Sequence, residues 1–193
     1  MDRRVRIAIT GGIGSGKSYV CRCLRRRGID VYDCDAAAKR LMRESGLLRR
    51  QLTALIGDHA YVDGRLNKEA VAVYMMKSDE HTARVNAVVH PAVADDFLKS
   101  GMTWMECAIL FESGFDRYVD KVVCVAAPEE VRIQRVMRRD GIPRDKVLEW
   151  MSKQLPQHEV MGRSDYVVVN DGDADVMQQL DALFLDLDIN EEG

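Results

Sequence analysis

The stretch that decides the fold runs from Val5 to Ser18 and reads VRIAITGGIGSGKS. Its first part places β-branched residues at alternate positions, at Val5, Ile7 and Ile9, which predicts a short strand buried on both faces. A glycine-rich segment follows and ends in Gly-Lys-Ser, which fits the pattern G-x-x-x-x-G-K-[ST]. An amphipathic segment comes next and predicts a helix that ends near Gly28. This order of strand, glycine-rich loop and helix predicts a phosphate-binding loop, or P-loop.

The residue types of this loop suit the phosphates of a nucleotide. Glycines allow backbone angles at which amide N–H groups turn inward around an anion, and the helix that follows adds the positive end of its dipole. We therefore expect Lys17 to reach the β- and γ-phosphates of ATP and Ser18 to hold Mg²⁺. The alternative is a glycine-rich turn that binds no nucleotide, and the flanking strand and helix patterns favour the phosphate site. The residues expected to bind the nucleotide here are Gly11, Gly12, Ile13, Gly14, Ser15, Gly16, Lys17 and Ser18.

Length and composition are typical of one compact globular domain. The chain has 193 residues, of which 47% are hydrophobic and 31% charged, and a formal net charge of -3. This charge disfavours a general nucleic-acid-binding surface, and no apolar run is long enough for a membrane span or resembles a secretion signal. The 5 cysteines form no C-x-x-C pair, so we expect reduced, buried thiols and no zinc site. We therefore expect a cytoplasmic protein with no membrane, nucleic-acid or obligate protein partner.

Beyond the first helix, apolar runs alternate with helical segments, which predicts an α/β fold with a parallel sheet. The region of about 36–100 carries mainly helical patterns, with a loop at 57–66 and an interruption at His90-Pro91, and we expect it to bind the acceptor substrate. The region of about 135–162 is expected to form a helical lid, with helices at 128–139 and 144–154, and the whole of 1–193 to form one domain. The further strands are expected at 29–32, 103–110, 121–126 and 166–170.

Two acids follow the second expected strand, at the end where open α/β sheets bind ligands. If this strand lies beside the first, Asp33 and Asp35 both approach the γ-phosphate. One could then hold Mg²⁺ through water, and the other could take a proton from an attacking hydroxyl. The alternative is that Asp35 only caps the helix that follows. The P-loop upstream favours catalysis by at least one of the two acids.

Several arginines lie in the helical segment 128–139, where Arg135, Arg138 and Arg139 occupy neighbouring faces. Arginines in such a position can neutralise charge on a phosphoryl group during transfer, although a charged run is more commonly a solvated helix face. His90 precedes a proline and is either a helix-ending residue or a ligand. Glu112 follows an apolar strand and is either an acid near a metal or a surface residue. The residues alone leave these alternatives open.

Motifs along nearly the whole chain resemble those of the dephospho-coenzyme A kinase family. They are TGGIGSGKS, the pair Asp33-x-Asp35, VVHP at 88–91, ILFESGF at 109–115, RVMRRD at 135–140 and RSDYVVVNDG at 163–172. The resemblance implies a P-loop NTPase fold of the nucleoside-monophosphate-kinase type, with a three-layer parallel sheet, a helical substrate-binding insertion and a helical lid. It also implies transfer of the γ-phosphate of ATP, with Mg²⁺, to the ribose 3′-hydroxyl of dephospho-CoA, the last step of coenzyme A synthesis.

The resemblance further implies roles for single residues. Asp35 is implied to be the general base and Asp33 to be directed toward the metal, alongside Ser18. Lys17 and Arg139 are implied to act in catalysis, Arg139 as the arginine of the lid. Asn170 is implied to lie near the adenine of ATP, and the residues implied to bind the coenzyme A substrate are His90, Lys39, which stands in place of a family arginine, and Glu112.

Two other kinds of protein share parts of this pattern. Shikimate kinase is a small-molecule P-loop kinase that also has D-x-D after its second strand, but the acceptor region here is much longer and no glycine triplet follows a third strand. A GTP-binding switch requires an N-K-x-D signature for guanine. The segment at 67–70 reads NKEA and lacks the aspartate. The sequence therefore favours a kinase of the dephospho-CoA type.

Overall fold

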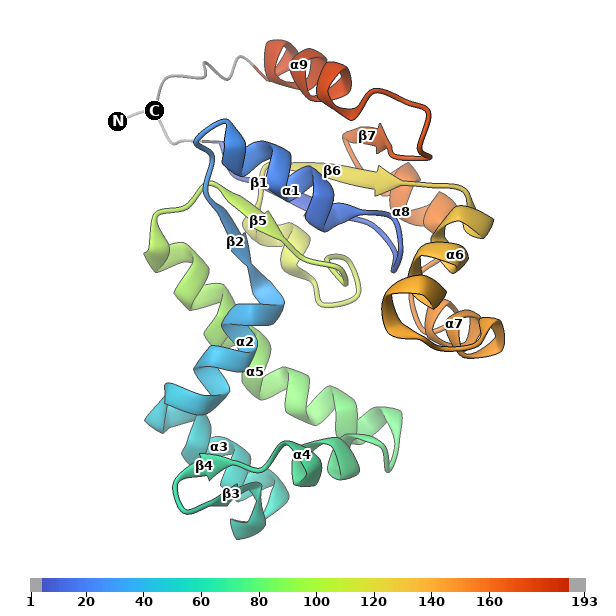
Figure 1. Ribbon diagram of the computed structural model, residues 1–193. Coiled ribbons are helices and arrows are strands. Elements are labelled where there is room, and N and C mark those ends of the chain that lie inside the picture. The colour runs from blue at the N-terminus through green and yellow to red at the C-terminus, as the bar shows by residue number, and fades with distance from the viewer. Residues whose placement is uncertain (1–4, 188–193) are drawn as a thin grey trace. The chain divides into compact units, whose positions relative to one another are not determined.

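The computed structural model describes residues 5–187. Within them, the main sheet has five strands in the order β2-β5-β1-β6-β7 (Figure 1). The pairs β1–β5, β1–β6 and β6–β7 are parallel, which confirms the predicted parallel sheet. The strands are β1 (Ile7–Thr10), β2 (Val31–Asp33), β5 (Trp104–Glu106), β6 (Lys121–Ala126) and β7 (Tyr166–Val169).

The strand order answers a question that the sequence left open, namely whether the second strand lies beside the first. β5 lies between β1 and β2, so the second strand of the chain is not the neighbour of the first. The expected strand 103–110 is also shorter, because it ends at Glu106, which pairs in register with Ile9 of β1. Sequence order does not decide which strands are neighbours, because a long connection can return the chain to either side of a strand. The acid at the end of β5, rather than those after β2, therefore lies beside β1.

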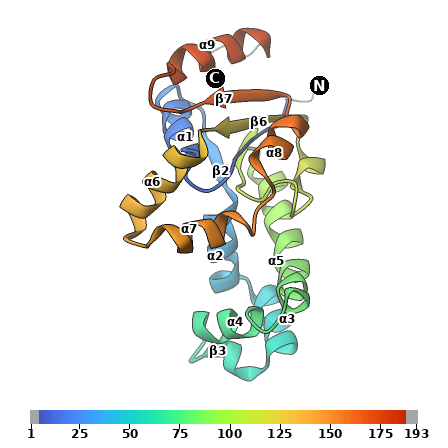
Figure 2. The same cartoon turned by 90° about the vertical axis from the view of Figure 1, so that its right-hand side faces the viewer.

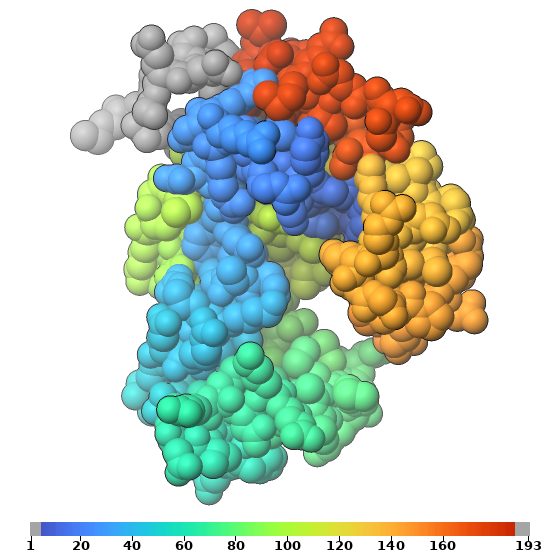
Figure 3. Space-filling view, in the orientation of Figure 1, coloured from blue at the N-terminus to red at the C-terminus, as the bar shows by residue number. Residues whose placement is uncertain are grey.

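The described residues form two compact units. One is made of residues 33–101, and the other, called the outer unit below, is made of residues 5–32 and 102–187. The outer unit holds the P-loop and most of the main sheet. The unit 33–101 holds four helices and a small hairpin among its described residues, drawn in cyan and green in Figure 3. Across residues 5–187, no helix is both long and apolar enough to cross a membrane.

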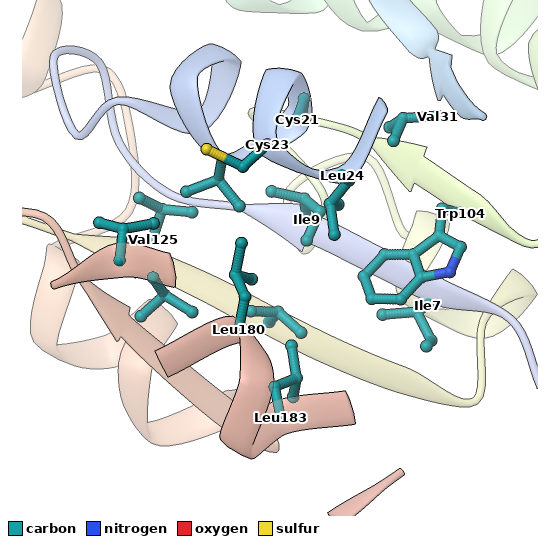
Figure 4. Packing of buried hydrophobic residues seen from close by; sticks show 14 of the residues in the cluster. Ile7, Ile9, Cys21, Cys23, Leu24, Val31, Trp104, Val125, Leu180 and Leu183 are labelled. Carbon is teal, nitrogen blue, oxygen red and sulfur yellow. The ribbon is translucent and has the colours of Figure 1, made fainter. Parts of the chain in front are cut away.

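The core of the outer unit lies between the sheet and two helices, α1 (Lys17–Arg26) and α9 (Val176–Asp186). Figure 4 shows Ile7 and Ile9 of β1 packed among side chains of both helices, with Leu24 from α1 and Leu180 from α9. Each of these four side chains has 0% exposure. Fully burying one such side chain stabilises the fold by about 1.5–3 kcal/mol, so this layer fixes the strand that leads into the P-loop.

The C-terminal half of the outer unit contains three further helices (Figure 2): α6 (Glu129–Asp140), α7 (Arg144–Met151) and α8 (Gln157–Arg163). α6 begins after Pro128, as the sequence predicts, and ends at Gly141, which has a φ of 67°. The expected helix 144–154 stops at Met151, and a separate helix α8 follows. Pro156 is the N-cap of α8, a position that suits proline because it needs no N–H donor there.

The unit 33–101 begins with α2 (Cys34–Glu44) and α3 (Gly46–Ile56). The expected loop 57–66 contains a 3₁₀ turn at Asp58–Ala60 and a hairpin of β3 (Tyr61–Val62) and β4 (Arg65–Leu66). The turn between these two strands is Asp63-Gly64, where both residues have positive φ, 49° and 75°. The helix α4 (Lys68–Met75) follows, and its N-cap is Asn67, whose side chain accepts a hydrogen bond from the N–H of Ala70.

The last helix of this unit, α5 (Asp79–Ser100), corrects the expected interruption at His90-Pro91, because it continues through Pro91. A proline inside a helix costs about 3 kcal/mol. Buried apolar side chains on both sides of it, among them Val89, Val93 and Phe97, offset this cost at about 1.5–3 kcal/mol each. Tertiary packing therefore overrides the local signal.

Candidate active site

The P-loop connects β1 to α1 and has the backbone geometry of an anion site. Gly11, Gly14 and Gly16 have φ values of 140°, 80° and 95°, which side chains strongly disfavour. Gly16 is the N-cap of α1, and no acid lies in the first turn of that helix. The positive end of the helix is therefore left for a negatively charged ligand.

A side chain at any of these positions would also meet close neighbours. A Cβ on Gly11 would lie 2.3 Å from the carbonyl oxygen of Val125 in β6, and one on Gly16 would lie 2.0 Å from Nδ2 of Asn170. A Cβ on Gly12 or Gly14 would collide with Arg132 of α6. The loop is thus enclosed by β6, by α6 and by the end of β7, all of which come from the distant C-terminal half of the chain.

Two side chains of the loop, those of Lys17 and Ser15, lie where they could contact a bound phosphate. Nζ of Lys17 donates hydrogen bonds to the carbonyl oxygens of Gly11, at 2.7 Å, and Gly12, at 3.4 Å. Burial lowers the pKa of Lys17, and the charge of Glu106 opposes this shift. Ser15 is fully buried, and its hydroxyl has no hydrogen-bond partner among residues 5–187. A buried hydroxyl without a partner in a P-loop fits a site that a phosphate oxygen completes.

Glu106, which the sequence interpretation treated only as part of a strand, belongs to this site. It ends β5 beside β1, is half-buried and acts on the charge of Lys17. The thiol of Cys21 in α1 is hydrogen-bonded to Glu106, and burial together with this acid raises the pKa of that thiol. An acid within the apolar run 103–110 was visible in the sequence, but its proximity to the P-loop follows from the strand order.

The arginines of α6 divide into those that contact the loop and those that face solvent. NH1 of Arg135 donates to the carbonyl oxygen of Asn170 at 2.8 Å and to that of Ser15 at 3.4 Å. Nδ2 of Asn170 donates to the same carbonyl of Ser15 at 2.9 Å. Arg139 lies in the last turn, exposed, and forms two hydrogen bonds with Asp140, at 2.7 and 2.8 Å. Arg138 is also exposed.

The connection from α7 to α8 holds the other side of the loop. Oε1 of Gln154 accepts a hydrogen bond from the backbone N–H of Ile13 at 2.8 Å. Glu112, which the resemblance assigns to the substrate, accepts one from the N–H of Leu155 at 3.1 Å. Gln154 is a further residue that sequence reasoning missed. No local pattern marks it, since it acts through a contact with a residue 141 positions away.

The remaining expected site residues belong to the unit 33–101. Asp33 is the N-cap of α2 and accepts a hydrogen bond from the N–H of Ala36 at 2.8 Å. It is therefore Asp33, and not Asp35 as the alternative interpretation had it, that caps this helix. Asp35 lies in the first turn of α2, exposed, and forms an ion pair with Lys39 one turn later. His90 is half-buried in α5, and burial lowers its pKa.

Comparisons with known proteins agree with the geometry of the P-loop and sheet. The family model described as dephospho-CoA kinase matches residues 5–175. The chain is 40% identical to the dephospho-CoA kinase of Porphyromonas gingivalis, covering 86% of each protein. It is 36% identical to that of Bacteroides fragilis, covering 91% of this chain and 89% of the relative.

Solved structures show the same fold. TT1252 from Thermus thermophilus is 34% identical, has a TM-score of 0.84 and is matched over 96% of this chain and 99% of that one. Shikimate kinase from Acinetobacter baumannii, solved with shikimate, is 16% identical with a TM-score of 0.58, covering 95% and 93%. At that identity the likeness to shikimate kinase concerns the fold alone.

Proposed function

The chain belongs to the dephospho-CoA kinase family, the enzymes of the final step of coenzyme A synthesis, and from this premise we propose how its residues carry out the transfer. The substrates are ATP and dephospho-CoA, whose ribose 3′-hydroxyl receives the γ-phosphate. The observation that carries the proposal is the P-loop. There the buried hydroxyl of Ser15 has no hydrogen-bond partner among residues 5–187, and the N-terminus of α1 has no acid in its first turn, so both suit a bound anion. We propose that the nucleotide is held by residues 11–18.

A magnesium ion fits the donors at this site. Mg²⁺ prefers hard oxygen ligands, and in kinases it takes few from the protein because phosphates and water supply the rest. The exposed hydroxyl of Ser18 and the carboxylate of Glu106 are such donors in the outer unit. Asp33 uses one carboxylate oxygen as the N-cap of α2, which leaves the other for a water molecule on the ion. When bound, Mg²⁺ would neutralise charge on the phosphates.

We assign the proton transfer to Asp35. Its carboxylate is exposed and pairs with the side chain of Lys39, whereas that of Asp33 is engaged by the backbone. In the proposed step, Asp35 takes the proton of the 3′-hydroxyl while the oxygen of that hydroxyl forms a bond to the γ-phosphorus. The bond between this phosphorus and its bridging oxygen breaks, and ADP leaves.

Cations stabilise the charge that moves during this step. Lys17 lies at the P-loop, and its ammonium would contact the β- and γ-phosphates during the transfer. Arg139 is tied only to its sequence neighbour Asp140 among the described residues, and we propose that it meets the phosphoryl group when the lid of about 135–162 closes. Arg135 and Asn170 border the loop at Ser15, and we propose that Asn170 lies near the adenine.

The acceptor is proposed to bind the helical unit 33–101, through His90 and Lys39. Glu112 would act from the outer unit, where it also holds the backbone of Leu155. Since both substrates are small molecules, the proposed reaction needs no membrane or nucleic acid, and we place it in the cytoplasm.

The test is product formation by the purified protein with ATP and Mg²⁺. Dephospho-CoA, shikimate and adenosine are offered separately, and the products are identified by mass spectrometry. We expect the mass gain of one phosphate on dephospho-CoA only, located at the 3′-hydroxyl by fragmentation. Release of ADP at the same rate with and without dephospho-CoA would contradict the proposed function, as would phosphorylation of shikimate in its place.

A further inference from the structure

A buried arginine stands behind the P-loop, and the mechanism above gives it no role. Arg132 lies in the first half of α6 and has only 6% exposure. Its Nε donates a hydrogen bond to the carbonyl oxygen of Ile13 at 2.9 Å, and its NH1 donates to Oε1 of Gln157 at 3.3 Å. Both acceptors are neutral. Removing a guanidinium from water is costly when no anion accompanies it, so the missing counter-charge needs an explanation.

Residues 5–187 provide no carboxylate that forms an ion pair with Arg132, and no hydrogen bond from its NH2 nitrogen is present among them. The acid that acts most on it is Glu129, which is exposed on the same helix. Burial lowers the pKa of Arg132, but a guanidinium still keeps its proton in proteins. The outer unit therefore carries a buried positive charge that its own acids do not neutralise.

The position of this charge indicates its partner. NH2 of Arg132 lies 2.3 Å from the place that a Cβ on Gly12 would take, and the carbonyl oxygen of Arg132 lies 2.5 Å from that of a Cβ on Gly14. Two glycines of the P-loop thus leave room for this one residue. The side chain borders the loop at Gly12 and holds the Ile13–Gly14 peptide through the carbonyl of Ile13.

We propose that Arg132 is the buried counter-charge of the nucleotide's phosphate chain, a positioning residue that acts through the P-loop peptide it holds. The proposal rests on the proposed function, since it requires a polyphosphate in the loop. Charges interact more strongly where water is excluded, so a cation behind the loop attracts the phosphates without touching them. Lys17 and Arg132 then supply positive charge from two sides of the same loop.

The experiment separates the charge of Arg132 from its packing. Dissociation constants for ADP, inorganic tripolyphosphate and adenosine are measured by calorimetry for the wild type, Arg132→Gln and Arg132→Lys, with Arg26→Gln as an exposed arginine control on α1. We expect Arg132→Gln to weaken ADP and tripolyphosphate about tenfold to a hundredfold, the range of a lost interaction with a charged group. Arg132→Lys keeps the charge and should stay within about fivefold of the wild type. Adenosine binding and the control should not change.

Steady-state kinetics adds a readout that a purely structural role would not move. Because the charge attracts the phosphates before and during transfer alike, KM for ATP should rise in Arg132→Gln while kcat changes little. Equal losses in Arg132→Gln and Arg132→Lys would overturn the proposal, since packing and not charge would then matter. So would an unchanged affinity for tripolyphosphate in Arg132→Gln.

A second variant tests the proposal if Arg132→Gln does not fold. Gly12→Ala would push the guanidinium away from the loop, so it should weaken tripolyphosphate binding while leaving adenosine binding intact. Unchanged tripolyphosphate binding in Gly12→Ala would overturn the proposal. A wild-type protein that is folded but binds neither ADP nor tripolyphosphate would instead overturn the proposed function itself, which is a distinguishable result.

Discussion

A pair of glycines allows the cost of the P-loop conformation to be separated from the cost of crowding the loop. Gly14 in the P-loop and Gly28 after α1 both have a φ of 80°. A Cβ on Gly28 would meet nothing within 4 Å, whereas one on Gly14 would lie 2.5 Å from the carbonyl oxygen of Arg132. Substituting each by alanine therefore places a side chain at the same unfavourable φ but with very different steric strain.

The structure sets the expected magnitudes. Holding a non-glycine residue in the left-handed region costs about 1–2 kcal/mol, which in a protein of this size lowers Tm by roughly 2–8 °C. Gly28→Ala should show this loss alone and keep its activity. Gly14→Ala adds a backbone-to-backbone collision, and overpacking of this kind costs about a further 1–3 kcal/mol. Relief requires the loop to move, and a shift of about 1 Å in a catalytic group can reduce the rate by about a hundredfold.

The assay is thermal unfolding of both variants together with kcat/KM for ATP at saturating dephospho-CoA. We expect Gly14→Ala to have the lower Tm and to lose at least about a hundredfold in kcat/KM, with Gly28→Ala close to the wild type in rate. If Gly14→Ala matched Gly28→Ala in both Tm and kcat/KM, the steric argument for the P-loop glycines would be refuted.

Three further predictions concern single side chains. Lys17→Ala should lose most of its activity and keep its fold, because the ammonium of Lys17 bonds only loop carbonyls among the described residues; turnover equal to the wild type would remove the P-loop assignment. Asp35→Asn should reduce kcat far more than it raises KM for ATP. The control Asp95→Asn, which removes a comparable exposed ion pair on α5, should change neither kcat nor KM. Normal turnover in Asp35→Asn would show that Asp35 is not the general base. His90 has a pKa lowered by burial, so the unfolded chain binds its proton more readily and stability should fall as the pH drops below about 6.5. Tm measured against pH should fall below about pH 6.5 in the wild type and fall less in His90→Gln. Identical profiles for the two proteins would contradict a lowered pKa of His90 in the folded state.

Residues that act on near neighbours in the chain were predictable from the sequence. The alternation of Val5, Ile7 and Ile9 and the glycines after it predicted β1, the P-loop and the start of α1 at Lys17. β6 has the predicted bounds of 121–126. The resemblance to one family, confirmed by the comparisons, was carried by short motifs of the same local kind.

The tertiary structure decided what depends on residues far apart in the chain. The interior place of β5 brings Glu106 near Lys17, and the sequence left the order of the strands in the sheet open. The burial of Arg132 against the loop was equally hidden, because in sequence it looks like any arginine of a charged helix.

The physical reason is the range of the forces involved. Backbone angles, caps and the periodicity of apolar residues are fixed within a few positions, so the sequence by itself determined the P-loop and most helices and strands of this protein. Strand order, the continuation of α5 through Pro91 and the environment of Arg132 depend on which surfaces are buried together. Burial is a property of the whole packed unit, and only the tertiary structure decided it.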